Sequence, residues 1–295
     1  MNDFDRQYLS LLKRVLSRGE RRITRSGAGT ISVHGEMIKH DLSRGFPLTT
    51  LRAIPFRLVS TELEWTLRGK TDKNSLQALN NHIWDKFCNP THVKHLKNYE
   101  KKFGSAFKDN DLGPIYGFQW RHFGARYTGP NSDYKGLGFD QIKTIIKLLK
   151  SRSFSKRMVI TNWNPAQVEE MAVPCCPVAF SVIRHGDRMN LSFFQRSADA
   201  VIGLPFDFAF YALLLHLFAL EARLRPGSIV GFFNNIEIFD QHIANAKKLV
   251  RRTPKRLARM ETRDFKTILK WKHDDSRLAG YKPNDQLKFE VHFSS

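Results

Sequence analysis

The residues of this sequence that are best suited to chemistry lie between positions 173 and 207. Cys176 follows Cys175 and stands between two prolines that would fix its loop, and Arg196 and Asp207 lie further along the chain. A thiolate kept ionised by an arginine can add to C6 of a pyrimidine, after which C5 can attack a one-carbon donor. A carboxylate can read a planar heterocycle through its N–H groups. These residues could carry out C5 transfer, but from the local sequence alone two buried core thiols are the more common use of such cysteines.

Strands and one helix must bring these side chains together. A turn at 184–188 separates two strand-like runs, so antiparallel pairing would place Arg196 opposite Cys176. A nearly all-apolar run follows Asp207, which predicts a central buried helix. Asp207 could instead serve only as the N-cap of that helix. The segments concerned are strands 158–161, 178–183 and 189–195 and the helix 206–220.

The remaining pattern predicts an α+β fold in which a large mixed sheet packs on helices. One predicted helix carries Glu62 and Glu64, of which one should face solvent and the other is a candidate buried acid. We expect a single domain over 1–295, with a basic surface insertion at 88–110. The other expected elements are helices 8–16, 58–67 and 139–149, strands 30–34 and 228–233, and short strands and loops from 261 onward.

Composition excludes several classes of protein. Hydrophobic residues make up 41% of the 295 residues, which argues against disorder. The three cysteines show no disulfide framework and no metal-ligand spacing, so no metal is expected. We expect no apolar run long enough to span a bilayer, and the start lacks a secretory pattern, so we expect a cytoplasmic protein. The net charge of +20 favours anionic partners, with nucleic acid as a minor alternative.

Several ordered motifs then resemble the thymidylate synthase family, from about residue 8 to the C-terminus. The proline-cysteine segment and the two segments after it stand at the family's own spacing, and four upstream segments match in order. The resemblance implies the family's α+β fold, a homodimer formed through the sheet with shared active sites, and 5,10-methylenetetrahydrofolate as co-substrate. It also suggests a bacterial or phage-infected cell as the source. The matching segments are 173–177, 195–199, 203–206, 25–30, 45–48, 83–85 and 112–117.

The resemblance also implies catalytic roles. Cys176 would be the nucleophile, and Arg196 would support its thiolate. Glu62 would organise proton transfers around the ring through water, and Tyr116 would help to remove the C5 proton. Asp207 would read the base.

Binding roles follow in the same way from the resemblance. The nucleotide phosphate would be held by arginines and a serine of one subunit and by two basic residues of the partner subunit, here a lysine and an arginine. Trp84 and Ile83 would line the folate pocket. Asp199 would form a hydrogen bond with the pterin, and Gly203 would let the two ligands stack closely. The implied nucleotide-binding residues are Arg25, Lys156, Arg157, Gln195, Arg196, Ser197, Asp199, Asp207, Glu237 and Phe239, and the implied folate-binding residues are Ile83, Trp84, Asp199, Gly203 and Phe206.

This sequence departs from the family pattern at informative positions. Asp207 replaces an asparagine, and an ionised carboxylate, which only accepts hydrogen bonds, suits the N4 amino group of cytosine better than O4 of uracil. Glu237 and Phe239 replace the histidine and tyrosine that usually bind the sugar. The deoxycytidylate hydroxymethylase branch carries aspartate at the position of Asp207, so dCMP and a 5-hydroxymethyl product are expected. Alternatives are a thymidylate synthase acting on dUMP, a cytidylate methylase or CMP hydroxymethylase, and a non-catalytic RNA-binding homologue.

Overall fold

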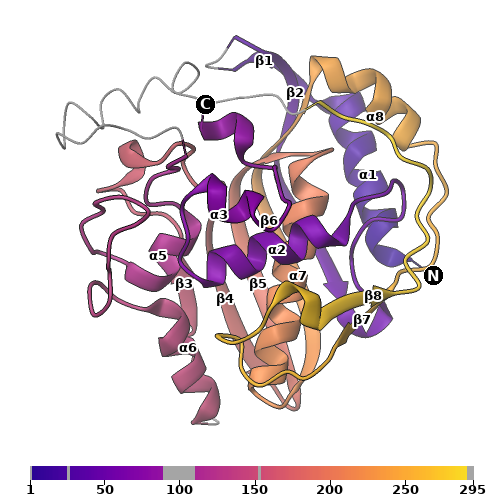
Figure 1. The fold of residues 1–295 in the computed structure, drawn as a ribbon. Coiled ribbons are helices and arrows are strands. Elements are labelled where there is room, and N and C mark those ends of the chain that lie inside the picture. Colours follow the sequence, from indigo (N-terminus) through magenta and orange to yellow (C-terminus); the bar gives the residue numbers. More distant parts are fainter. Residues whose placement is uncertain (1, 25–26, 89–109, 152–153, 291–295) are drawn as a thin grey trace.

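A six-stranded mixed sheet forms the centre of the computed structural model, which describes residues 2–24, 27–88, 110–151 and 154–290 (Figure 1). The strand order is β1-β2-β6-β5-β4-β3. Every neighbouring pair is antiparallel except β5 and β6, which run parallel and are joined by the long helix α7. The strands are β1 (Glu20–Ile23), β2 (Gly29–Asp41), β3 (Val159–Thr161), β4 (Pro177–His185), β5 (Arg188–Asp199) and β6 (Arg225–Phe239).

The two faces of this sheet differ in burial. One row of cross-strand partners, Ile38, Gly231, Phe193 and Phe180, lies on the face covered by helices, and its three side chains are buried. Gly231 has no side chain there because a Cβ would lie only 2.7 Å from the ring of Phe193. The next row, on the opposite face, contains exposed apolar side chains. They are Met37, Phe232 and Phe194, and Val159 is a further exposed apolar residue at the edge of the sheet.

Helices α1, α2, α6 and α7 contribute to the same hydrophobic core as the covered face of the sheet. Helix α1 does so through one apolar stripe, whereas α7 is apolar all round and most of its residues are buried. The helices are α1 (Asp3–Arg18), α2 (Phe56–Leu67), α3 (Lys73–Gln77), α5 (Tyr116–His122), α6 (Gln141–Lys150), α7 (Gly203–Glu221) and α8 (Ile243–Leu249), and a hairpin of β7 (Arg259–Thr262) and β8 (Ser276–Ala279) completes the fold.

These elements confirm the α+β prediction and correct three details. Contrary to expectation, helix α7 is long and apolar enough to span a bilayer by length and composition alone. However, 72% of the 18-residue stretch that meets these criteria is buried inside the structure. Glu64 does not point freely into solvent, because its carboxylate accepts hydrogen bonds from the backbone N–H and Nδ1 of His273, both at 2.8 Å. Helix α7 begins at Gly203, so Asp207 lies one turn inside it and is not its N-cap. Most of the expected insertion at 88–110 lies outside the described residues.

Candidate active site

The pairing of β4 with β5 places Arg196 beside Cys176. Pro177 opens β4 and is paired with Gln195, and the backbone N–H of Arg196 donates to the carbonyl oxygen of Cys176 at 2.9 Å. From this position Arg196 Nη2 lies 3.8 Å from Cys176 Sγ. The juxtaposition expected from the turn between the two strands is therefore present.

Two backbone carbonyls and an aromatic ring hold the guanidinium of Arg196. Its Nε donates to the carbonyl oxygen of Cys175 at 3.0 Å, and Nη2 donates to that of Pro174 at 2.6 Å. The guanidinium also lies 5.5 Å from the ring centre of Trp163. Sequence reasoning missed Trp163, since nothing in its neighbourhood distinguishes it from a core aromatic residue.

The two cysteines have different surroundings. Cys175 is fully buried against Met171, whereas Cys176 remains partly exposed. Burial raises the pKa of the Cys176 thiol to about 11, although Arg196 acts to lower it. Burial likewise raises the pKa of Cys175 to about 12. The direction at Cys176 is opposite to our expectation, because desolvation of the thiolate outweighs a cation 3.8 Å away. The free site therefore holds a thiol.

Asp207 faces β5 from the start of α7. Its Oδ2 accepts a hydrogen bond from Gln195 Nε2 at 2.7 Å, and Gln195 Oε1 is buried without a protein partner in the described structure. Burial raises the pKa of Asp207 to about 7, Gln195 opposes this shift, and the charge of Asp199 adds to it. The carboxyl is thus poised between its neutral and ionised forms near neutral pH.

Glu62 and Tyr116 approach the same site from another side. The indole Nε1 of Trp84 donates to Glu62 Oε1 at 2.7 Å, and the backbone N–H of Cys176 donates to the hydroxyl oxygen of Tyr116 at 3.3 Å. Burial raises the pKa of Glu62 to about 8, with a further rise caused by Asp207. Glu62 is therefore mostly protonated at neutral pH and can exchange a proton with a bound water or substrate.

The parallel pairing of β5 and β6 adds polar groups at the ends of these strands. Ser197 pairs with Asn235, and Asn235 Nδ2 donates to Ser197 Oγ at 3.4 Å. Two residues further along, Asp199 pairs with the buried Glu237. Burial raises the pKa of Glu237, and the charge of Asp199 raises it further. Phe239 is buried.

Asp199 and Gly203 shape the turn between β5 and α7. Asp199 Oδ1 accepts from the backbone N–H groups of Val201 and Ile202 at 2.8 and 2.9 Å, while Oδ2 lies 3.8 Å from Nδ1 of His242. A Cβ on Gly203 would lie 3.7 Å from both Asp199 Cβ and Asp207 Oδ2, so glycine keeps the space between the two carboxyls open. His242 was not among the predicted site residues.

The aromatic and aliphatic residues expected to line the folate pocket, Trp84 and Ile83, lie in or against a second, smaller hydrophobic cluster. Trp84 belongs to it, and Ile83 and Tyr116 pack against it; the rings of Trp84 and Tyr116 are 5.9 Å apart. Phe206 instead packs half-buried against the main core at the start of α7. Tyr116 thus contacts both sides, since its ring packs near Trp84 and its hydroxyl accepts from the backbone N–H of Cys176.

The implied phosphate site is only partly assembled within this chain. Arg196 and Ser197 lie on β5 beside the cysteine, but Lys156 and Arg157 are exposed in the segment before β3. Arg25 lies outside the described residues. Over the described ranges, no group of three or more His, Cys, Asp or Glu residues has an arrangement that could hold a metal ion.

A buried amide lies behind the cysteine loop and was also missed from the sequence. Asn162 Nδ2 donates to the carbonyl oxygen of Pro177 at 2.8 Å and to the hydroxyl of Tyr211 at 3.3 Å, while its Oδ1 accepts from the indole N–H of Trp120. Because Pro177 follows Cys176 directly, Asn162 fixes the backbone that carries the thiol.

Comparison with known proteins identifies the family. The family model described as thymidylate synthase matches residues 6–293. The chain belongs to the thymidylate synthase family. Members of this family are one-carbon methyltransferases that use methylenetetrahydrofolate as co-substrate, and the predicted enzyme class and co-substrate are therefore confirmed.

Curated relatives carry the same family name. The thymidylate synthase of equine herpesvirus 2 is 35% identical over 97% of this chain and 98% of its own length. Thymidylate synthase 1/2 of Encephalitozoon cuniculi is 35% identical over 97% of both chains. The bifunctional dihydrofolate reductase-thymidylate synthase of Paramecium tetraurelia is 34% identical, and the chain spans 61% of that protein's length. These relatives are eukaryotic and viral, and their names do not indicate the hydroxymethylase branch.

Proposed function

We propose that this member of the thymidylate synthase family transfers a one-carbon unit from methylenetetrahydrofolate to C5 of dCMP and gives 5-hydroxymethyl-dCMP. The Cys176 thiol gives up its proton and its sulfur adds to C6 of the base, after which C5 attacks the methylene group of the folate. Loss of the C5 proton and of tetrahydrofolate leaves an exocyclic methylene on C5. Water adds to this methylene, and elimination of the Cys176 thiolate from C6 restores the ring and frees the enzyme. In the same proposal Glu62 and Tyr116 serve the proton transfers, and Arg196 contacts the phosphate.

The position of Asp207 is the observation that carries the choice of cytosine. Its carboxyl lies inside α7 and accepts a hydrogen bond from Gln195. After burial, the charge of Asp199 raises the pKa of Asp207, and the charge of Asp207 in turn raises the pKa of Glu62. A cluster of carboxyls favours a base that presents an amino group. In its neutral form Asp207 can accept from N4–H of cytosine and donate to N3, and in its ionised form it still accepts from N4–H.

A second candidate is methylation of dUMP to dTMP. The names of the relatives favour it, and so does the raised pKa of Asp207. A neutral carboxyl can accept from N3–H of uracil and donate to O4, as an asparagine amide does. The relatives thus favour uracil, whereas the replacement of an amide by a carboxyl favours cytosine.

The active unit in this proposal is a homodimer formed through the exposed face of the sheet. Met37, Phe232 and Phe194 form an exposed apolar row across β2, β6 and β5, which is the surface that a second copy would cover. Lys156 and Arg157 would then reach the phosphate in the partner's site, while Ile83, Trp84, Gly203 and Phe206 contact the folate. A cytoplasmic location is proposed with it.

Tritium release distinguishes the two candidates. The protein is incubated with C5-tritiated dCMP, CMP or dUMP and methylenetetrahydrofolate, while dihydrofolate is followed by absorbance. We expect release from dCMP without dihydrofolate, because addition of water leaves tetrahydrofolate. Release from dUMP with formation of dihydrofolate would establish the second candidate, and release from none of the nucleotides would argue against both.

A further inference from the structure

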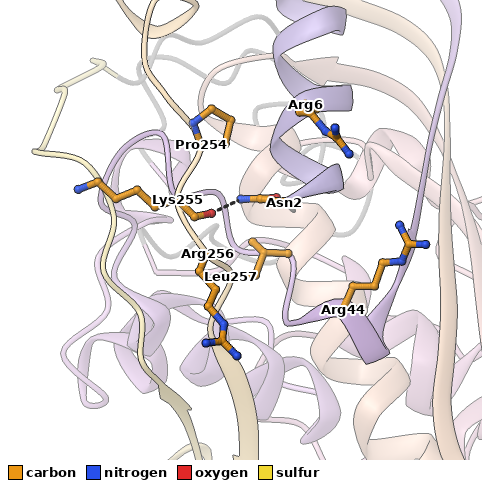
Figure 2. A pocket seen from close by; sticks show the side chains of 7 residues that line it. All are labelled: Asn2, Arg6, Arg44, Pro254, Lys255, Arg256 and Leu257. Atoms are coloured by element: carbon orange, nitrogen blue, oxygen red, sulfur yellow. Dashed lines mark hydrogen bonds between the residues drawn. The ribbon is translucent and has the colours of Figure 1, made fainter.

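A groove lined by cations lies on another part of the molecule, between the start of α1, the end of β2 and the segment before β7. One pocket of about 700 Å³ is lined by Asn2, Arg6, Arg44 and residues 254–257 (Figure 2). A second pocket of about 600 Å³ shares Lys255, Arg256 and Leu257 with the first and continues to β7 and β8. We call the two pockets together the cation groove. Its charged lining residues are Arg6, Arg44, Lys255, Arg256, Arg259 and Lys282.

The charged side chains that line this groove are all cationic. No carboxylate is among the described residues that line either pocket. Arg6 has an ion pair with Asp3 at 3.1 Å, and Lys255 Nζ donates to the carbonyl oxygen of Pro283 at 3.0 Å. Arg44 and Arg256 are both exposed, and neither is paired with a described acidic residue. Cations that line one groove repel one another, and a multivalent anion relieves that repulsion.

The backbone beneath the groove is fixed by a buried polar cluster. Asn2 Nδ2 donates to the carbonyl oxygen of Lys255 at 2.8 Å, as Figure 2 shows, and the N–H of Lys255 donates to Thr50 Oγ1 at 2.8 Å. Asn2 and Thr50 both donate to the buried carboxylate of Asp5. The main chain that carries Lys255 and Arg256 is therefore held in place before any ligand arrives.

The opposite rim is held just as closely. The N–H of Phe46 donates to the carbonyl oxygen of Ala258 at 2.7 Å, and the two residues form an isolated antiparallel bridge. Gly45, at φ 120°, has no room for a side chain, because a Cβ would lie 2.6 Å from Leu257 Cβ. Arg44 and Arg256 thus stand next to two segments that are joined by backbone hydrogen bonds.

From this geometry we infer that the cation groove is a binding site for a small oligophosphate, outside the catalytic pocket. Arginine forks match phosphate oxygens in bidentate fashion, and four of the six lining cations are arginines. Consecutive phosphates concentrate more negative charge in a short length than consecutive carboxylates of a peptide do. The only apolar side chains in the first pocket are Pro254 and Leu257, and no aromatic ring lines either pocket to stack a base.

Titration calorimetry with inorganic tripolyphosphate tests this site. The double variant Arg44→Gln/Arg256→Gln should weaken binding roughly tenfold or more, since two charge-assisted contacts are lost. The matched control is Lys13→Gln/Arg18→Gln, which removes two exposed charges from α1 outside the groove. We expect the control to bind within about twofold of the parent protein, because distant exposed charges are screened by salt.

Three further arms complete the experiment. Arg196→Ala should retain tripolyphosphate binding, which separates the groove from the nucleotide phosphate site. A nucleoside triphosphate that binds more tightly than tripolyphosphate, with the same loss in the double variant, would show that the phosphates come attached to a nucleoside. Equal loss in the double variant and its control, or tighter binding of a pentaglutamate peptide or of single-stranded RNA than of tripolyphosphate, would overturn the inference.

Discussion

Burial sets the pKa values of the ionisable groups at and around Cys176, whereas the ionisable groups of the cation groove remain in contact with water. In the active site the pKa values of Cys176, Glu62 and Asp207 are all raised, to about 11, 8 and 7, with desolvation as the largest cause. In the groove, Arg44 and Arg256 are exposed. In the active site, burial keeps protons on groups that would ordinarily lose them at a lower pH. In the groove, exposed positive charges attract anions, and solvent and salt partly screen that attraction.

This contrast predicts how strongly each region responds to a single substitution. Groups in the enclosed site have few alternative partners, so loss of one atom changes a reacting bond or leaves a buried group unpaired. Groups in the open groove share their task with several neighbours and with water. The largest effects should therefore come from the active site and the smallest from the groove.

The largest expected effect is that of removing the nucleophile. Cys176→Ala should lower kcat on the order of 10⁴-fold or more, because the neighbouring thiol of Cys175 is fully buried and cannot replace it. The matched control is Cys175→Ala, which removes a fully buried thiol packed on Met171 and should keep kcat within about tenfold. Tritium release measures both, and mass spectrometry of the trapped nucleotide adduct locates the bond. Loss of the adduct in Cys175→Ala alone would mean that the roles of the cysteines are reversed.

The next effect concerns the base. Asp207→Asn should move the ratio of kcat/KM for dCMP and dUMP toward dUMP by about 1–3 kcal/mol, roughly 5- to 150-fold, because an amide cannot ionise and always keeps one donor for O4. Unchanged preference in this variant would remove the argument that the carboxyl reads cytosine.

The same residue should also set a pH dependence. The pKa of Asp207 is raised to about 7, so its neutral, donating form predominates below that pH and is lost as pH rises through it. Because only the neutral form can donate to N3 of cytosine, we expect kcat/KM for dCMP to fall above about pH 7 in the parent protein. The same profile should be flatter in that range for Asp207→Asn. A parent profile that rises through pH 7 and is not altered by the substitution would contradict this assignment.

Sequence patterns could predict much of this arrangement. The turn at 184–188 between apolar runs placed β4 beside β5, and with it Arg196 beside Cys176, because antiparallel register follows from local turn geometry. The uninterrupted apolar run of α7 likewise indicated a buried central helix. The start of α7 was wrong by three residues, since Pro205 looks like a helix boundary but is tolerated in a first turn.

Properties that depend on the full tertiary surroundings could not be read from the sequence. The expected lowering of the Cys176 pKa considered only Arg196, but the desolvation that reverses it comes from segments far apart in the chain. Trp163, Asn162 and His242 acquire their contacts with Arg196, Pro177 and Asp199 only when separate strands and loops meet. Their residue types carry no local signal for these roles.

Asn162 offers a smaller effect that acts through position rather than contact with substrate. Asn162→Ala should lower kcat roughly tenfold with little change in KM, since the carbonyl of Pro177 loses the donor that fixes the cysteine loop. Asn164→Ala is the matched control, because Asn164 bonds Gln119 and Gln167 in a neighbouring buried cluster. The rate of Cys176 alkylation by iodoacetamide should change only in Asn162→Ala. Equal changes in both variants would indicate general loosening of the core.

The smallest effect should come from the groove in the absence of anions. Arg44→Gln/Arg256→Gln should change the free energy of unfolding by less than about 0.5 kcal/mol, because both side chains are exposed and form no ion pair with a described acidic residue. Urea denaturation at low and high salt measures this. Any change should be a small gain in stability at low salt, where mutual repulsion of the groove cations is least screened, and should vanish at high salt. A loss of more than about 2 kcal/mol would show that these arginines support the fold, and the contrast between the two regions would then fail.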